Sequence, residues 1–105
     1  MKRFACLTRH PMNQEQRDLA SLQDIELVDV GDVDAFDKAG VNFLFGRLLK
    51  DNYDGVIVVH PTLAIRALAT GFEVGVFENA NRAALGEKPE FYASSLHVFD
   101  ARMVV

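Results

Sequence analysis

The chain has 105 residues, half of them hydrophobic and a quarter charged, which predicts a single globular domain over residues 1–105. The formal net charge of −4 argues against binding to long nucleic acids, for which a basic surface is expected, but leaves room for a local basic pocket. The apolar stretches are too short for a membrane span or a signal peptide, so the sequence predicts no membrane partner and a cytoplasmic location.

The first part of the chain predicts a strand, a polar loop, a helix and a second strand. Residues 3–7 form an apolar run of strand length, and Asn13 with Gln16 has the spacing of a capping box for a helix ending near residue 22. Cys6 lies inside the apolar run, so it is expected to be a small buried side chain rather than a reactive thiol. Residues 25–30 alternate apolar and acidic side chains, which predicts a more exposed strand.

An acidic cluster precedes the next predicted helix, and it consists of Asp29, Asp32, Asp34 and Asp37. We expect Asp32 or Asp34 to cap that helix, in preference to a metal site, because a carboxylate stabilises the positive N-terminal end of a helix. Over residues 33–50 the apolar side chains recur at steps of three and four, which predicts a long amphipathic helix. The expected apolar stripe is Val33, Phe36, Gly40, Phe43, Leu44 and Leu48.

The second half predicts a central strand, a helix and two more strands. Residues 56–59 are an uninterrupted β-branched run, typical of a buried parallel strand. Pro61 suits the first turn of a helix over 62–70, which Gly71 would end. Residues 72–77 predict a fourth strand, and residues 78–89 are polar and interrupted by glycine and proline. The tail from residue 91 predicts an antiparallel edge strand or hairpin.

This alternation of strands and helices predicts an α/β domain. Right-handed crossovers would give a mostly parallel four-stranded sheet in the order 2-1-3-4, with helices on both faces and the C-terminal antiparallel strand or hairpin at an edge. The first and third strands would then be neighbours, with their helices leaving to opposite faces. Ligands of open α/β sheets bind at such a switch point.

Polar residues follow both of these neighbouring strands. Thr8, Arg9 and His10 come after the first strand, and residues 60–62, His-Pro-Thr, come after the third. Two helices also begin at this edge, so free backbone N–H groups near residues 13–16 and 62–64 could join Arg9 in binding an anion. The combination predicts a pocket for a phosphate-bearing ligand. Neither a glycine-rich dinucleotide fingerprint nor a P-loop is present, so no cofactor is expected.

Each candidate ligand contact also has an alternative that involves no ligand. Thr8 and Thr62 are suited to capping turns, and His10 and His60 to satisfying carbonyls at strand ends, as well as to contacting a ligand. Arg66, one turn into its helix, could face the pocket or solvent. In the polar stretch, Arg82, together with Asn79, could reach over a ligand or have no role in binding. The candidate ligand-binding residues are therefore Thr8, Pro61, Thr62, Arg66, Asn79 and Arg82, beside the candidate catalytic residues Arg9, His10 and His60.

The stretch Leu7-Thr-Arg-His-Pro-Met-Asn-Gln-Glu-Gln-Arg-Asp18 resembles the start of small CRISPR-associated accessory proteins of type III systems. In those proteins an apolar strand is followed by a threonine or serine, a histidine and a T-x-E-Q pattern. The likeness extends more loosely to Val58-Val-His-Pro-Thr62, Glu73-Val-Gly-Val-Phe77 and His97-Val-Phe99. The chain departs from some members by carrying His-Pro-Thr at a turn where they have glycine.

The resemblance implies a Rossmann-like homodimer, related to the domains that sense cyclic oligoadenylate, with a role in antiviral defence. It would bind and cleave that messenger as a metal-independent ring nuclease, with cyclic tetra-adenylate the expected ligand, and so switch off type III CRISPR signalling. The ligand's own ribose 2′-hydroxyl would attack the neighbouring phosphate. Arg9 and the helix N–H groups near Thr62 would stabilise the charge that develops. His10 or His60 would orient the hydroxyl or protonate the leaving oxygen.

Three other functions stay open at this point. The same pocket could bind a cyclic oligonucleotide or another phosphorylated ligand without cleaving it. The chain could be a structural partner that assembles through its terminal hairpin and long helix. A metal enzyme would need His10, His60 and an aspartate from the acidic cluster as ligands, although the cluster already has a capping role.

Overall fold

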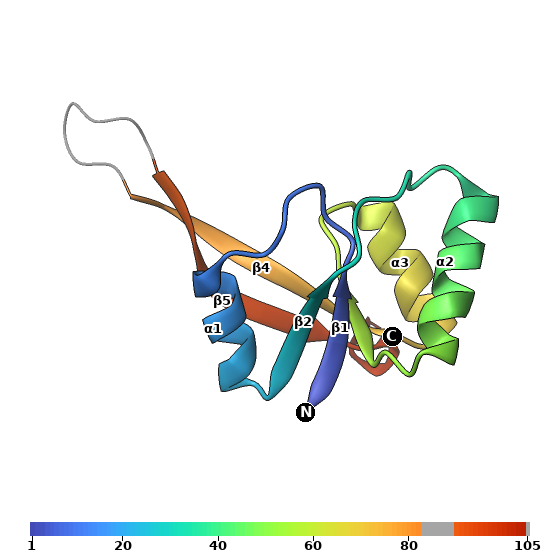
Figure 1. Ribbon diagram of the computed structural model, residues 1–105, viewed down its shortest axis with the longest axis horizontal. Coiled ribbons are helices and arrows are strands. Elements are labelled where there is room, and N and C mark those ends of the chain that lie inside the picture. The colour runs from blue at the N-terminus through green and yellow to red at the C-terminus, as the bar shows by residue number, and fades with distance from the viewer. Residues whose placement is uncertain (83–89, 105) are drawn as a thin grey trace.

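The computed structural model describes residues 1–82 and 90–104, and in this part of the chain five strands form one mixed sheet with three α-helices around it (Figure 1). The strands are β1 (Lys2–Cys6), β2 (Ile25–Asp29), β3 (Gly55–Ile57), β4 (Glu73–Arg82) and β5 (Glu90–Phe99). The helices are α1 (Gln14–Leu22), α2 (Lys38–Lys50) and α3 (Pro61–Thr70), and a 3-10 turn, η1 (Ala101–Val104), follows β5.

The sheet order is β2-β1-β3-β4-β5. β1 pairs in parallel with β2 and β3, and β3 pairs in parallel with β4, whereas β5 runs antiparallel to β4. The predicted α/β class is confirmed, and β1 and β3 are neighbours as expected. The predicted antiparallel edge strand is β5, so the sheet has five strands and is mixed, where the sequence predicts four mostly parallel strands with that strand or a hairpin at an edge.

The fourth strand, β4, is longer than the sequence predicts. β4 does not stop at residue 77 but continues through the polar residues Glu78 and Asn79 to Arg82, paired throughout with β5 and with a register shift between Glu78 and Asn79. Hydrogen bonding to a partner strand therefore overrides the polar local composition that predicted irregular structure there. The far ends of the paired strands extend past α1 as an arm, away from α2 and α3 (Figure 1), and the molecule measures 47 × 29 × 28 Å.

Helix α2 begins later than predicted and buries a different stripe. Its N-cap is Asp37, whose carboxylate accepts the Gly40 N–H, so neither Asp32 nor Asp34 caps it. Those two aspartates instead accept the N–H groups of Val33 and Phe36, which holds residues 32–36 in turns that compete with helix. The buried residues of α2 are Val41, Phe45 and Leu48, while Phe36 and Phe43 of the predicted stripe are 76% and 69% exposed.

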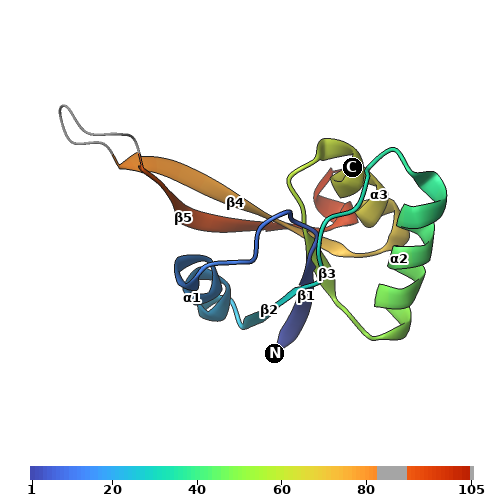
Figure 2. The ribbon, with the colours of Figure 1, turned by 45° about the horizontal axis from the view of Figure 1, so that its top comes forward.

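Two apolar cores lie on opposite faces of the sheet. α2 and α3 pack on one face, with Leu7 and Val58 among the sheet residues buried there. α1 packs on the other face, against Phe4 and Ile57. The sheet curls around α1, which contacts both edge strands, and the Gln23 side chain donates to the Leu96 carbonyl of β5 at 2.8 Å. Figures 1 and 2 show α1 on one side of the sheet and the other two helices on the opposite side.

The helix ends follow local sequence signals closely. Asn13 and Gln16 form the predicted capping box of α1, and α3 begins at Pro61 and ends at Gly71, whose φ of 106° lies in the left-handed region. None of the described helices is long and apolar enough to cross a membrane.

Candidate cleft at the carboxyl edge of the sheet

A cleft of about 370 Å³ lies at the edge where the parallel strands end, between the β1–α1 loop and β4. Figure 1 shows this loop at the edge to which the arrowheads of β1 and β2 point. β3 ends at Ile57, so the residues after it form the floor of the cleft, whereas β4 continues past this edge and forms a wall. The lining residues are Thr8, Arg9, His10, Pro11, Met12, Asn13, Gln16, Ile57, Val58, Val59, Val76 and Phe77.

The lining combines an apolar surface with cationic and polar groups. Val59 is 83% exposed at the end of β3, and Val76 is partly exposed on β4, so apolar side chains are accessible in the cleft. Arg9 and His10, both exposed, come from the loop opposite. None of these described lining residues is an aspartate or glutamate, although the whole chain carries a net charge of −4. The cleft therefore suits a ligand that has both an anionic group and an apolar or aromatic part.

The β1–α1 loop uses its own side chains to satisfy its backbone. The Thr8 hydroxyl donates to the His10 carbonyl oxygen at 2.8 Å. The Gln16 N–H donates to the Asn13 side chain at 2.9 Å, and the Asn13 N–H donates to the Gln16 side chain at the same distance. The prediction that N–H groups near residues 13–16 are free for an anion is thus wrong for Asn13 and Gln16, and the turn-capping alternative describes Thr8.

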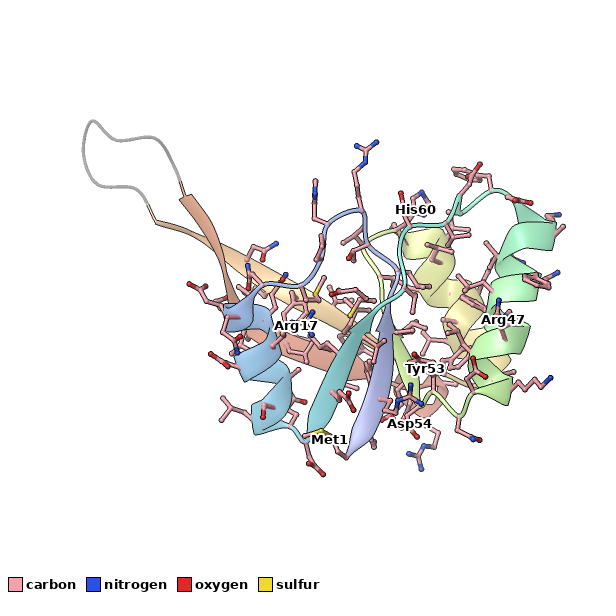
Figure 3. The ribbon with its side chains drawn as sticks, in the orientation of Figure 1. Met1, Arg17, Arg47, Tyr53, Asp54 and His60 are labelled. Atoms are coloured by element: carbon pink, nitrogen blue, oxygen red, sulfur yellow. The ribbon has the colours of Figure 1, made fainter. Side chains whose placement is uncertain are left out.

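The second histidine does not join the first. His60 is the N-cap of α3, where its Nδ1 accepts the Thr62 N–H at 3.1 Å, and its ring lies edge-on to Phe36 with the centroids 5.4 Å apart (Figure 3). Neither His60 nor Pro61 nor Thr62 lines the cleft. The physical reason is that α1 and α3 leave the sheet toward opposite faces, which separates the two His-Pro turns although their strands are adjacent. A ligand-binding role for residues 60–62 stays a prediction.

Arg66 and Asn79 also lie outside the cleft lining. The Arg66 guanidinium donates to the Asn42 side chain at 2.7 Å, so it ties α3 to α2. Asn79 is exposed on β4 just after the register shift. Arg82 ends β4, and its side chain lies outside the described part of the structure. Of the nine residues selected from the sequence, the cleft brings together Thr8, Arg9 and His10.

Three polar residues that the sequence did not indicate meet across β4 and β5. His97 Nε2 lies 2.9 Å from Glu78 Oε2, and the Ser95 hydroxyl donates to the same oxygen at 2.9 Å. The hydrogen bond from His97, followed by that from Ser95, lowers the pKa of the Glu78 carboxyl below its usual range. Ser95 also contacts Nε2 of His97, so the ring does not bridge serine and acid through its two nitrogens as a catalytic triad requires.

A sequence signal could have located part of this group. The spacing of Ser95 and His97 places both side chains on one face of a strand. Glu78 joins them only because the antiparallel register pairs it with Ser95, which no local pattern encodes.

Cys6 is buried, and the aspartates of the described residues form no metal site. The Cys6 side chain is 1% exposed, and burial raises the pKa of its thiol to about 12, which confirms its interpretation as a small buried side chain. Among residues 1–82 and 90–104 no three His, Cys, Asp or Glu side chains are placed to hold a metal ion. In particular, His10, His60 and the aspartates do not form such a group.

Comparison with known proteins assigns the chain to no family. No protein-family model matches the sequence, and no curated protein is significantly similar to it. The resemblance of residues 7–18 to type III accessory proteins is therefore an expectation from that motif alone. The cleft and its chemistry are the observations from which a function can be inferred.

Proposed function

We propose that the protein binds a cyclic oligoadenylate, with cyclic tetra-adenylate the preferred ring, in the cleft at the carboxyl edge, and cleaves it without a metal ion. The observation that carries the proposal is the pairing of Arg9 and His10 with an apolar wall free of carboxylates among its described residues. A guanidinium binds phosphodiester oxygens, and apolar side chains such as Val59 and Val76 can pack against adenine. The resemblance of residues 7–18 selects cyclic oligoadenylate among phosphodiester ligands.

The proposed reaction needs only groups that the ligand and the loop supply. The ribose 2′-oxygen attacks the adjacent phosphorus, the bond from phosphorus to the 5′-oxygen breaks, and the 2′-hydroxyl proton is lost while the 5′-oxygen gains one. The products carry a 2′,3′-cyclic phosphate and a 5′-hydroxyl. Arg9 stabilises the negative charge on the phosphorane. One ring nitrogen of His10 transfers the proton from the 2′-hydroxyl to the 5′-oxygen. Because His60 lies outside the cleft lining, the chemical role falls to His10.

A second copy of the chain would complete the site. A cleft of about 370 Å³ is small within the ~300–1,000 Å³ range of ligand sites, so a ring of four nucleotides would extend beyond it. A ring with two-fold symmetry can meet two identical clefts related by a two-fold axis. We therefore expect a homodimer with one ring bound per two chains.

Calorimetry and product analysis with cyclic tetra-adenylate, in the presence of a metal chelator, test the proposal. Arg9→Ala should weaken binding about 10- to 100-fold, because a charge-assisted hydrogen bond contributes about 1.5–3 kcal/mol. His10→Ala should bind the ring but lower the cleavage rate about 10²- to 10⁴-fold, the usual contribution of a general acid or base. Mass spectrometry should show the 2′,3′-cyclic phosphate in the wild-type reaction.

His60→Asn is the matched control for His10→Ala. Asparagine keeps an acceptor for the Thr62 N–H, so α3 stays capped while the imidazole is lost. The control should bind and cleave like the wild type. Absence of binding by the wild type would sink the proposal, and binding with an intact ring after long incubation would leave a non-catalytic binding module. Equal losses in the two histidine variants would contradict the assignment of the site to this cleft.

A further inference from the structure

The loop that carries Arg9 and His10 is fixed at both of its ends to neighbouring strands. At the start, the Leu7 N–H donates to the Ile57 carbonyl of β3 at 2.9 Å. At the end, the Met12 N–H donates at 3.0 Å to Oδ1 of Asp29, the last residue of β2. Met12 is 9% exposed and its side chain packs into the core beneath α1. Residues 8–11 therefore span a short gap between two fixed points.

Asp29 is itself held by a residue of α1. The second carboxylate oxygen, Oδ2, lies 2.6 Å from the Arg17 guanidinium, whose other nitrogen donates to the Leu27 carbonyl at 2.9 Å. Figure 3 shows Arg17 between α1 and β2. The two side chains are 37% and 33% exposed, so water screens this pair less than it screens a fully exposed one. Arg17 and Asp29 thus connect β2, α1 and the end of the β1–α1 loop.

The pair also affects the charge beside the cleft. Asp29 is hydrogen-bonded to the backbone of Met12, a lining residue, so an unpaired carboxylate there would repel an anionic ligand. The Arg17 guanidinium opposes that charge at 2.6 Å. The contact between Arg17 and Asp29 therefore holds the loop in place and offsets a negative charge that would otherwise repel an anionic ligand.

We propose that Arg17 and Asp29 are positioning residues of this cleft, which set the conformation of the β1–α1 loop and keep its surroundings favourable to an anion. The identity of the ligand rests on the proposed function, whereas the effect of Asp29 on the loop conformation can be measured in the free protein. Asp29 Oδ1 holds the Met12 N–H, and Arg17 holds Asp29 in place while neutralising it. Neither side chain lines the cleft, so both act through the loop.

Amide hydrogen exchange of the free protein and calorimetry with cyclic tetra-adenylate, on three variants, test the inference. Asp29→Ala should speed exchange at Met12 at least 10-fold and weaken binding about 10-fold. Asp29→Asn keeps an oxygen acceptor at this position, so exchange at Met12 should stay within about threefold of wild type. Arg17→Gln leaves the carboxylate unpaired, so the ratio of wild-type to variant affinity should be larger at low salt than at high salt.

The ion pair between Lys2 and Glu73, 2.7 Å apart at the opposite edge of the sheet, provides the matched control. Glu73→Gln should leave both Met12 exchange and ligand affinity at wild-type values. Unchanged Met12 exchange in Asp29→Ala would overturn the positioning role whatever the ligand. Equal effects in Glu73→Gln and Asp29→Ala would also overturn it, because a general loss of stability would then explain both. If the wild type binds no ring, the proposed function fails, while the exchange data still decide the role of Asp29 in the loop.

Discussion

Cys6 couples the stability of the protein to alkaline pH. Its thiol is buried in β1, and its pKa is raised to about 12 from an ordinary value of 9.0. Between these values the unfolded chain loses the thiol proton while the folded chain keeps it. The free energy of unfolding should therefore fall as pH rises above about 9, by up to ~1.4 kcal/mol per pH unit from this group.

Urea denaturation of the wild type and of Cys6→Ala at several pH values between 8 and 11 checks this. The alanine variant loses some packing but has no thiol to titrate, so its stability should decline less steeply with pH. Lysines and tyrosines titrate in both proteins, and their contribution cancels in the difference. Parallel declines would show that the Cys6 thiol does not remain protonated in the folded state.

At the scale of single residues, the sequence located side chains whose partners are close in the chain. The helix caps involve residues only a few positions apart, so they can be recognised in the sequence. Examples are the capping box of Asn13 and Gln16 and the terminating Gly71. The positions of His60 and Arg66, outside the cleft lining, were not predictable for the opposite reason. Their surroundings are set by Phe36 and by Asn42, which only the packing of separate elements brings near.

Two glycines in different elements should respond oppositely to the same substitution. A Cβ on Gly55 of β3 would lie 2.6 Å from the Phe4 ring and 2.7 Å from the Glu73 carbonyl oxygen. Gly46, in the middle of α2, has nothing within 4 Å of that position and is exposed. Gly55→Ala should therefore destabilise the protein by about 1–3 kcal/mol, and Gly46→Ala should stabilise it by about 0.5–1 kcal/mol.

Thermal and urea denaturation of both variants measure these changes, each serving as the control for the other. Overpacking forces the Phe4 ring or the backbone of β4 to move, whereas alanine in α2 reduces only the entropy lost on folding. Stabilisation by Gly55→Ala would show that the core around Phe4 can accommodate a methyl group in spite of these close approaches. A loss of stability in Gly46→Ala would show that α2 needs glycine for a reason other than its helical backbone.

At the scale of elements, the sequence predicts all three helices and the starts of α1 and α3, but it places the start of α2 too early. α2 was predicted from residue 33 because apolar spacing continues through residues 33 and 36. Side-chain hydrogen bonds of Asp32 and Asp34 hold that stretch in turns, and the helix begins only after Asp37. Periodicity alone does not distinguish a helix from turns that happen to place apolar residues at similar intervals.

At the scale of the whole molecule, the arm should open more easily than the rest of the sheet. β4 pairs with β3 over Glu73–Gly75 and with β5 from Val74 onward, so beyond Gly75 only β5 pairs with it. A two-stranded ribbon is marginally stable by itself. Amides of the β4–β5 pairing beyond Glu78 should therefore exchange through local opening, and the paired amides of β1 and β3 only through global unfolding.

Native-state hydrogen exchange at increasing urea concentration measures both kinds of opening. Arm amides should show a smaller opening free energy and a weaker dependence on urea than amides of the central strands. A single opening free energy shared by arm and central strands would contradict this picture, because it would make the ribbon part of one cooperative unit with the sheet.

The architecture was the most predictable property, and the extent of the arm was the least. Alternating strands and helices with right-handed crossovers leave few topologies, so the adjacency of β1 and β3 and the edge position of the cleft followed from the chain order. The continuation of β4 through Glu78 and Asn79 depends on pairing with Ser95 and Ala93, which lie 17 and 14 positions later in the chain. That long-range pairing also creates the Glu78–Ser95–His97 group, which explains why the sequence does not indicate it.

The difference in length between β3 and β4 gives the two sides of the cleft different mechanical properties. The floor at Ile57 and Val58 belongs to the middle of a five-stranded sheet packed on both faces, so it is stiff. The wall at Val76 and Phe77 lies where the sheet passes into a two-stranded ribbon, and Phe77 also packs against the core beneath α1. Any widening of the cleft would therefore have to come from this wall, and it would disturb the packing of Phe77 on that core.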